Sequence, residues 1–137
     1  MSKNQSAVLI AEDNAEIAKL IKLYLEGEGY KTVWAEDGAV GLAAARNEAF
    51  SAVLVDIMMP KMNGYKATQA IRRLPDRDKA CIPIVAMTAN AFEEDKRDAF
   101  AAGMNGHIAK PIQVDKLLST LAEVWGKEMT DETDCHM

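Results

Sequence analysis

Five side chains that could bind a cation or a phosphoryl group follow directly after short apolar runs in this sequence. In chain order they are Glu12, Asp13, Asp56, Thr88 and Lys110. If the apolar runs are parallel strands, their carboxyl ends meet at one edge of the sheet, which is where such sheets bind ligands. We therefore expect these five residues, which are far apart in the sequence, to form one site.

The residue types at these positions predict phosphoryl chemistry. Three carboxylates gathered at one edge would repel by about 4 kcal/mol per pair at about 4 Å and an effective dielectric of about 20, so a cation must offset the repulsion. Oxygen ligands without a nearby Cys or His pair favour Mg²⁺ over zinc. The ammonium group of Lys110 and the hydroxyl of Thr88 would hold the other oxygens of a phosphoryl group. The chemistry that fits is phosphoryl transfer to a carboxylate.

The alternation of short apolar runs with longer stretches of helical spacing predicts the sheet that would position these residues. This pattern is typical of a parallel sheet covered by helices on both faces. The five apolar runs cover residues 7–11, 32–35, 52–55, 82–87 and 107–109. Because Pro83 lacks a backbone N–H, we expect strand pairing in the fourth run to begin just after it.

The stretches around these runs predict five helices. In the first, apolar residues at i, i+3, i+4, i+7 and i+8 form a stripe, namely Ile17, Leu20, Ile21, Tyr24 and Leu25. Asn14 is placed to cap the start of this helix, and Gly29 to end it. Further helices are predicted over residues 39–48, 64–74, 92–102 and 114–125. With right-handed crossovers, these elements predict a doubly wound five-stranded α/β sheet.

Length and charge limit the possible classes of protein. The chain has 137 residues, 49% of them hydrophobic and 27% charged, which predicts one folded domain. A formal net charge of −5 argues against nucleic acid or an anionic membrane as a partner, since both need a basic face. No run approaches the roughly 18 apolar residues of a membrane span. Residues 1–7 have no signal-peptide pattern, and we expect a cytoplasmic protein.

The chain ends and the cysteines predict little further structure. We expect a folded domain over residues 7–126, a disordered N-terminus over 1–6, and a disordered acidic tail over 127–137. The two cysteines, Cys81 and Cys135, give neither a disulfide framework nor metal-ligand spacing, and we expect both to be free thiols.

The five strand-end residues belong to longer motifs. These are Glu12-Asp13, the segment 56–60 (DIMMP) with Gly64 eight residues after Asp56, the segment 87–90 (MTAN) containing Thr88-Ala89, and the segment 103–111 (GMNGHIAKP) ending in Lys110-Pro111. In these motifs, from about residue 7 to 125, the chain resembles the receiver domains of response regulators, both stand-alone receivers and those inside hybrid sensor histidine kinases. The resemblance implies a flavodoxin-like sheet with strand order 2-1-3-4-5.

The resemblance also implies roles for the site residues. Asp56 would take a phosphoryl group from a phosphohistidine of a sensor histidine kinase or a histidine phosphotransfer protein, and water would later remove it. The implied Mg²⁺ ligands are Asp13, Glu12 directly or through water, one Asp56 oxygen and the backbone carbonyl of Met58. Lys110 would pair with the phosphoryl group. Such a receiver promotes only its own phosphorylation and dephosphorylation and is not otherwise an enzyme.

A phosphorylation switch is a further implication of the resemblance. Thr88 would hydrogen-bond the phosphoryl group and shift the Ala89 loop, and so change a surface that binds an output protein, which the sequence does not identify. The Lys110-Pro111 bond is usually cis in this family. In this family an aromatic residue three positions before the lysine usually takes part in the switch, but this chain has His107 at that position. His107 is therefore either a switch residue or an ordinary edge-strand residue.

The resemblance places two further residues beside the path of the attacking water. These are Met58 and Asn90, two positions after the phosphoacceptor and the threonine, and they would tune the lifetime of the phosphoryl group. The alternative for both residues is ordinary loop filling.

Three other functions are compatible with parts of this pattern. A Mg²⁺-dependent phosphohydrolase of the haloacid dehalogenase type uses a strand-end Asp, but it needs a second Asp where this chain has Met58. A flavin-binding module shares the strand order, yet no phosphate loop rich in Ser, Thr and Gly follows the first strand. A degenerate receiver used only for protein contacts is disfavoured because all of the site residues are present.

Overall fold

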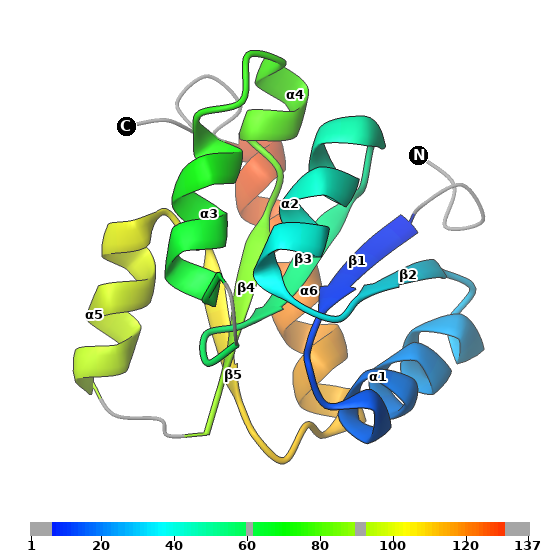
Figure 1. Cartoon of the computed structure of the whole chain (residues 1–137). Helices are drawn as coiled ribbons and strands as arrows, with labels where there is room; N and C mark the ends of the chain where they lie inside the picture. Colours follow the sequence, from blue (N-terminus) through cyan, green and yellow to red (C-terminus); the bar gives the residue numbers. More distant parts are fainter. Residues whose placement is uncertain (1–6, 60–61, 90–92, 131–137) are drawn as a thin grey trace.

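A single parallel sheet forms the centre of the molecule (Figure 1). The computed structural model describes residues 7–59, 62–89 and 93–130. Within these residues, five strands are arranged in the order β2-β1-β3-β4-β5, and all neighbouring strands are parallel. Their bounds are β1 Ala7–Ala11, β2 Lys31–Ala35, β3 Ala52–Asp56, β4 Ile84–Thr88 and β5 Gly106–Ala109. The doubly wound sheet with order 2-1-3-4-5 is therefore confirmed, and β4 begins directly after Pro83, as predicted.

Helices cover both faces of the sheet (Figure 1). In the described segments they are α1 Ala15–Gly27, α2 Gly38–Asn47, α3 Gly64–Arg72, α4 Arg77–Ala80, α5 Glu93–Ala102 and α6 Val114–Thr130. The buried residues of α1 and α6 form one core cluster with alternate residues of the strands, among them Val8 and Ile10. The buried residues of α2, α3 and α5 form a second cluster with the intervening residues, such as Leu9 and Ala11. Alternation of side chains along the strands thus supplies both cores.

The first helix begins and ends as its sequence predicts. Asn14 Oδ1 accepts hydrogen bonds from the backbone N–H groups of Glu16 at 2.9 Å and Ile17 at 3.2 Å. After the helix, Gly29 has φ 94°, a conformation that residues with a Cβ rarely adopt. The cap at Asn14 fixes where the connection between β1 and α1 ends. Glu12 and Asp13 lie in that connection.

The number of helices differs from the prediction, and two helices end more than one residue away from their predicted ends. Six helices rather than five are present in the described residues, because α4 was not predicted. It has only four residues, too few to show an apolar stripe, and Asp76 caps it by accepting from the N–H groups of Asp78 and Lys79. Helix α3 ends at Arg72, and α6 continues past Gly126 to Thr130. A glycine costs a helix only about 1 kcal/mol, which need not end it.

The prediction of two free thiols is wrong for Cys81, which is disulfide-bonded. A disulfide depends on the distance between two cysteines in the folded chain, which their spacing in the sequence does not reveal. Cys135 lies outside the described residues, as do the predicted disordered N-terminus over 1–6 and residues 131–137 of the predicted tail.

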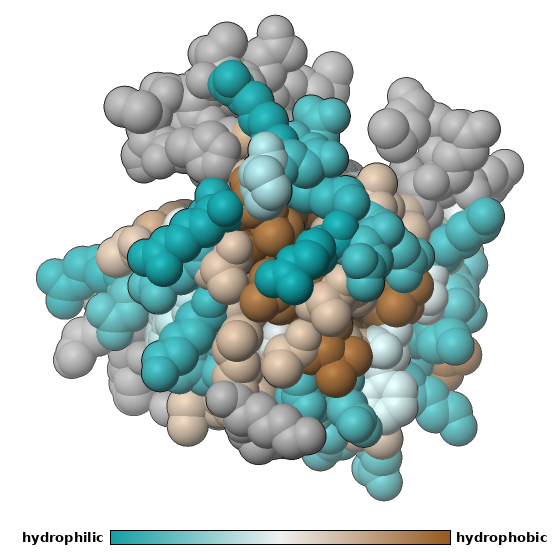
Figure 2. Space-filling model, turned by 45° about the horizontal axis from the view of Figure 1, so that its top comes forward, coloured by the Kyte–Doolittle hydropathy of each residue, from teal (hydrophilic) through white to brown (hydrophobic). Residues whose placement is uncertain are grey.

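Much of the surface carries hydrophilic side chains. Figure 2 shows them spread over one face, with hydrophobic residues exposed between them. Among the described residues, no helix is both long enough and apolar enough to cross a membrane.

At the end of the sheet where β4 and β5 begin, the guanidinium of Arg72 joins three segments of the chain. Its hydrogen bonds go to the carbonyl oxygens of Gly103 (2.9 and 2.7 Å), Ala80 (2.7 Å) and Ile82 (2.6 Å) and to Asn105 Oδ1 (2.7 Å). Burial lowers the pKa of Arg72 to about 10, so the group stays charged at neutral pH. Arg72 therefore ties α3 to the connections that precede β4 and β5.

We expect Arg72→Met to lower the free energy of unfolding by about 3 kcal/mol, because buried carbonyl oxygens left without donors cost about 1–3 kcal/mol each. Chemical denaturation measures this change. The exposed neighbour Arg73 offers a matched control, and Arg73→Met should change stability by no more than about 0.5 kcal/mol. Similar losses in the two variants would contradict this structural role of Arg72.

Candidate functional site

Four of the five strand-end residues predicted to form a site lie within direct reach of one another. One carboxylate oxygen from each of Glu12, Asp13 and Asp56 lies within 4.8 Å of the others. Lys110 Nζ is 3.0 Å from Glu12 Oε1 and 3.1 Å from Asp56 Oδ2. Glu12 and Asp56 are buried, at 0% and 4% exposure, whereas Asp13 is exposed. The cluster is thus acidic, partly open to solvent, and joined by one ammonium group.

Asp56 is positioned by the end of β3 and by the turn that follows it. It pairs with Met87 of β4, and the next residue, Ile57, donates its N–H to the Met87 carbonyl at 3.1 Å. Met58 N–H donates to Asp56 Oδ1 at 3.0 Å, while Oδ2 faces Lys110. A Cβ at Gly64 would lie 2.7 Å from the Asp56 carbonyl oxygen, so α3 can begin this close to the strand end only with glycine. Both carboxylate oxygens are therefore held in place.

Glu12 is positioned by contacts with β2 and with its own connection to α1. Its N–H donates to the Ala35 carbonyl at 3.0 Å, and its carbonyl accepts from Trp34 Nε1 at 2.7 Å. Its carboxylate accepts from Asn14 N–H through Oε2 at 3.1 Å. Sequence reasoning missed Trp34, because an apolar residue in a predicted strand gives no signal of a hydrogen bond to a neighbouring loop.

Thr88 and Lys110 lie at the ends of adjacent strands. Thr88 is the last residue of β4 and is buried, at 3% exposure. Lys110 follows β5, and its N–H donates to the Thr88 carbonyl at 2.8 Å. The Lys110-Pro111 peptide bond is cis, which confirms the expectation from the resemblance. The polar edge therefore runs from β1 through β3 to β4 and β5.

Burial and charge set the proton affinities at this edge. Burial raises the pKa of Glu12 to about 7, although the Lys110 ammonium and the Asn14 N–H act in the opposite direction. Burial alone would lower the pKa of Lys110, but hydrogen bonds and charge attraction to Glu12 and Asp56 outweigh it and raise the pKa. The lysine is therefore fully charged at neutral pH, and a further cation would favour the ionised form of Glu12.

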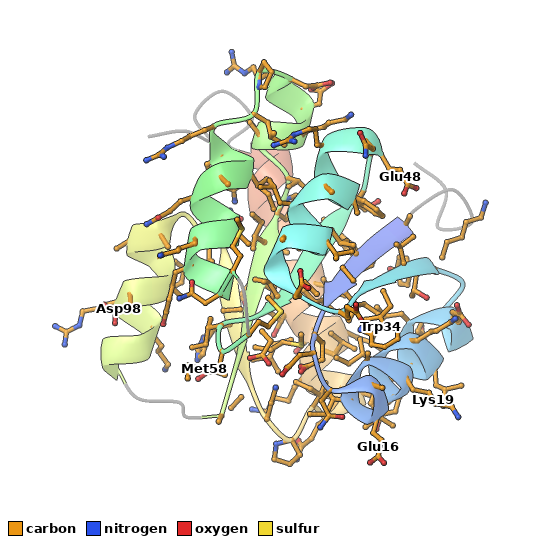
Figure 3. All side chains as sticks on the ribbon, in the orientation of Figure 1. Glu16, Lys19, Trp34, Glu48, Met58 and Asp98 are labelled. Atoms are coloured by element: carbon orange, nitrogen blue, oxygen red, sulfur yellow. The ribbon has the colours of Figure 1, made fainter. Side chains whose placement is uncertain are left out.

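The residues predicted to act in switching or in tuning the phosphoryl lifetime lie farther apart than the residues of the acidic cluster. Met58 is 73% exposed, and Figure 3 shows it near the end of β3. Ala89 is exposed after β4. His107 is partly exposed in β5 and alternates with Ile108, which belongs to the α1–α6 core, so His107 faces the side of the sheet that α5 covers. Asn90 lies outside the described residues.

The donor set suits a hard divalent cation. Three carboxylates supply only oxygen ligands, and Asp13 leaves the cluster open to water on one side. Mg²⁺ prefers such sites, with one or two carboxylates and several waters. The raised pKa of buried Glu12 means that ionising the cluster is costly without such a cation.

Comparison with known proteins establishes the family. The response regulator receiver domain model matches residues 8–122. The chain therefore belongs to the response regulator receiver domain family.

Individual relatives come from sensor kinases and chemotaxis. The chain is 35% identical to the sensor protein GacS of Pseudomonas syringae pv. syringae over 92% of its own length, but it spans only 14% of GacS. Its fold matches the receiver domain of the sensor histidine kinase PA1611 of Pseudomonas aeruginosa PAO1, with TM-score 0.80, 32% identity and coverage of 88% of this chain and 98% of that one. That structure has a magnesium ion coordinated in the active site cleft. The chemotaxis response regulator CheY4 of Vibrio cholerae matches with TM-score 0.81 and 30% identity, over 87% of this chain and 98% of that one.

Proposed function

We propose that this receiver takes a phosphoryl group from a phosphohistidine onto Asp56 and thereby switches a surface that binds an output protein. The donor would be a sensor histidine kinase or a histidine phosphotransfer protein. The observation that carries the proposal is the buried Asp56 carboxylate, with Lys110 Nζ at 3.1 Å and the carboxylates of Glu12 and Asp13 within 4.8 Å. A nucleophile at this position would lie beside groups that can neutralise a phosphoryl group, and this supports the proposal.

In the proposed reaction, an Asp56 oxygen forms a bond to phosphorus as the bond from phosphorus to the imidazole nitrogen breaks. The bonding electron pair stays on the imidazole. Met58 N–H fixes one Asp56 oxygen, and Lys110 moves from the carboxylate toward the phosphoryl oxygens. Thr88 would hydrogen-bond another phosphoryl oxygen. Asp56 is therefore the catalytic nucleophile, and Lys110 and Thr88 are its partners.

Glu12, Asp13, one Asp56 oxygen and the Met58 carbonyl would hold Mg²⁺. When bound, this ion neutralises charge on the phosphoryl oxygens, which is the main help available in a loose transition state. The structural relative solved with magnesium supports the choice of cation.

Phosphorylation would add about −1.5 to −2 charge at neutral pH and draw Thr88 toward the site. The loop at Ala89 and the surface formed by α5, β5 and α6 would shift in response. His107 lies in β5 on the side that α5 covers, where such a shift would reach it. Met58 and Asn90 would border the water that later removes the phosphoryl group. We propose that these events occur in the cytoplasm, without nucleic acid or a membrane as partner.

Acetyl phosphate provides a direct test of the function. Incubation of the protein with acetyl phosphate and Mg²⁺ should give one covalent phosphoryl group per chain in the intact mass spectrum. The product should be labile to hydroxylamine, as acyl phosphates are, and should not form when Mg²⁺ is chelated. A degenerate receiver would acquire no label. Many turnovers of an aryl phosphate per molecule would support a phosphohydrolase instead.

The raised pKa of Glu12 predicts a pH dependence. Because the folded protein keeps a proton at Glu12 up to about pH 7 while the unfolded chain loses it near 4.5, the folded state binds more protons in this range. The contribution of Glu12 to stability is therefore greatest below pH 4.5 and is lost as the pH rises through about 7. In metal-free buffer, Glu12→Gln should remove this decline from the measured unfolding free energies.

The affinity for Mg²⁺ should depend on pH in the opposite way over the same range. The ion competes with the proton for Glu12, so its affinity should rise as the pH increases through about 7. Bound Mg²⁺ stabilises the folded state by about 2.7 kcal/mol at 100 times its dissociation constant. Thermal denaturation with and without Mg²⁺ at several pH values measures both effects, and the absence of any Mg²⁺ shift would contradict the metal site.

A further inference from the structure

The sequence contains two tryptophans, Trp34 and Trp125, and both donate their indole N–H to a backbone carbonyl. Trp34 donates to Glu12 at 2.7 Å, across 22 positions of sequence, and Trp125 donates to Ser51 at 3.0 Å. The first bond reaches the acidic cluster. The second is at the other end of the sheet, beside the start of β3.

We propose that Trp34 is a positioning residue for metal binding: its indole N–H holds the peptide group between Glu12 and Asp13 and so aims both carboxylates at the cation. This inference rests on the proposed function, because it concerns the same Mg²⁺ site. Figure 3 shows Trp34 at the end of β2, beside the connection from β1 to α1.

The peptide group that Trp34 contacts is the one that joins the two acidic residues. A peptide unit is planar, so the Glu12 carbonyl and the Asp13 N–H turn together. Rotation of this plane would redirect the backbone on both sides and move both carboxylates. A hydrogen bond to its oxygen therefore restrains two ligands at once.

The neighbouring contacts fix the backbone on either side of this peptide group but do not fix the orientation of its plane. Glu12 N–H is held by the Ala35 carbonyl at 3.0 Å, which fixes the peptide plane before Glu12. Asn14 caps α1, which fixes the chain after Asp13. Only three residues, 12 to 14, connect β1 to α1. Between these two fixed points, Trp34 Nε1 donates to the carbonyl oxygen of the peptide group that joins the two acidic residues.

The exposure of Trp34 also points to a role for its N–H. The side chain is 46% exposed on an edge strand and belongs to neither core cluster, so packing in the core does not account for so large a residue at this position. Phenylalanine would cover a similar area without the donor. Trp34→Phe should therefore fold, and it isolates the hydrogen bond.

Trp34→Phe should weaken Mg²⁺ binding about fivefold, as expected for loss of one hydrogen bond. Calorimetric titration of the metal-free protein with Mg²⁺ measures the dissociation constant. Trp125→Phe is a matched control, because it removes the same kind of hydrogen bond far from the site, and it should leave Mg²⁺ affinity within about twofold of the wild type. Unchanged affinity in Trp34→Phe, or equal losses in both variants, would overturn the proposal.

The rate of phosphorylation by acetyl phosphate distinguishes a loss of Mg²⁺ positioning in Trp34→Phe from general damage to the fold. At saturating Mg²⁺, the rate of Trp34→Phe should return to within about twofold of the wild type, since the defect lies in the affinity for the metal. A rate that stays low at saturating Mg²⁺ would refute the assigned role. If the wild-type protein itself binds no Mg²⁺, the proposed function fails, and this inference fails with it.

Fluorescence gives a readout that keeps Trp34 intact. In Trp125→Phe, where Trp34 is the only tryptophan, Mg²⁺ should change the emission with the same midpoint as the calorimetric titration. In Trp34→Phe, where Trp125 is the only tryptophan, Mg²⁺ should leave the emission unchanged. If the emission of Trp34 stays unchanged while Mg²⁺ binds saturably, the indole is not coupled to the metal and the proposal is wrong.

Discussion

Asp56→Asn is expected to abolish phosphorylation by acetyl phosphate, with a rate at least about 1000-fold below that of the wild type. The amide has the same shape as the carboxylate, so Met58 N–H can still donate to its oxygen. It carries no charge, however, and is a poor nucleophile. Intact mass after incubation with acetyl phosphate and Mg²⁺ measures the effect.

Two controls separate this loss from misfolding. Asp98→Asn makes the same chemical change on α5, away from the acidic cluster (Figure 3), and should leave phosphorylation unchanged. In metal-free buffer above about pH 7, where Glu12 is also ionised, Asp56→Asn should be about as stable as the wild type, because relief of repulsion with Glu12 and Asp13 offsets the lost ion pair with Lys110. Normal labelling of Asp56→Asn would refute the assignment of the phosphoacceptor.

Lys110→Met is expected to slow phosphorylation by about 100- to 1000-fold, the usual cost of removing a donor that stabilises developing charge. Lys110 Nζ lies 3.0 Å from Glu12 Oε1 and 3.1 Å from Asp56 Oδ2, close to where phosphoryl oxygens would be placed. Methionine keeps a long apolar side chain in the same space. The initial rate of labelling at saturating Mg²⁺ measures the change.

Although Lys110→Met should slow phosphorylation, it should not weaken the binding of Mg²⁺. The ammonium group competes with a cation for the same carboxylates, so its removal should leave Mg²⁺ binding unchanged or tighter. Lys116→Met, on the exposed surface of α6, should alter neither property. A slower reaction accompanied by weaker Mg²⁺ binding would indicate damage to the acidic cluster instead.

The residues that form the site are predictable from the sequence because most of the polar groups follow a nearly continuous apolar run, although the run before Lys110 is short and includes His107. Such runs mark buried parallel strands, whose carboxyl ends share one edge. Glu12, Asp56 and Lys110 come together for this reason. The strand order came from the resemblance to receivers, since five apolar runs alone are compatible with more than one order.

The contacts of Trp34 and Arg72 are not predictable in the same way. Both residues donate to backbone carbonyls, a group that nearly every residue offers, so no pairing pattern in the sequence marks them. Their partners are set by the register of β1 with β2 and by the loops before β4 and β5. Only the folded chain fixes these distances.

The helix boundaries show a second limit. Helix α4 is one turn long, and its signal is a capping residue without an apolar stripe. Gly126 predicts a helix end because glycine is common after helices, yet α6 continues to Thr130. Neither difference touches the polar edge, where the strands rather than the helices position the side chains.

Reduction of the phosphorylated protein with borohydride, followed by peptide sequencing in the mass spectrometer, is the most direct test of the phosphoacceptor. Borohydride converts an aspartyl phosphate to homoserine and leaves free carboxylates unchanged. We expect homoserine at position 56 alone, and only in protein that received both acetyl phosphate and Mg²⁺. Homoserine at Asp13 or at another aspartate, with position 56 unmodified, would contradict the proposed site.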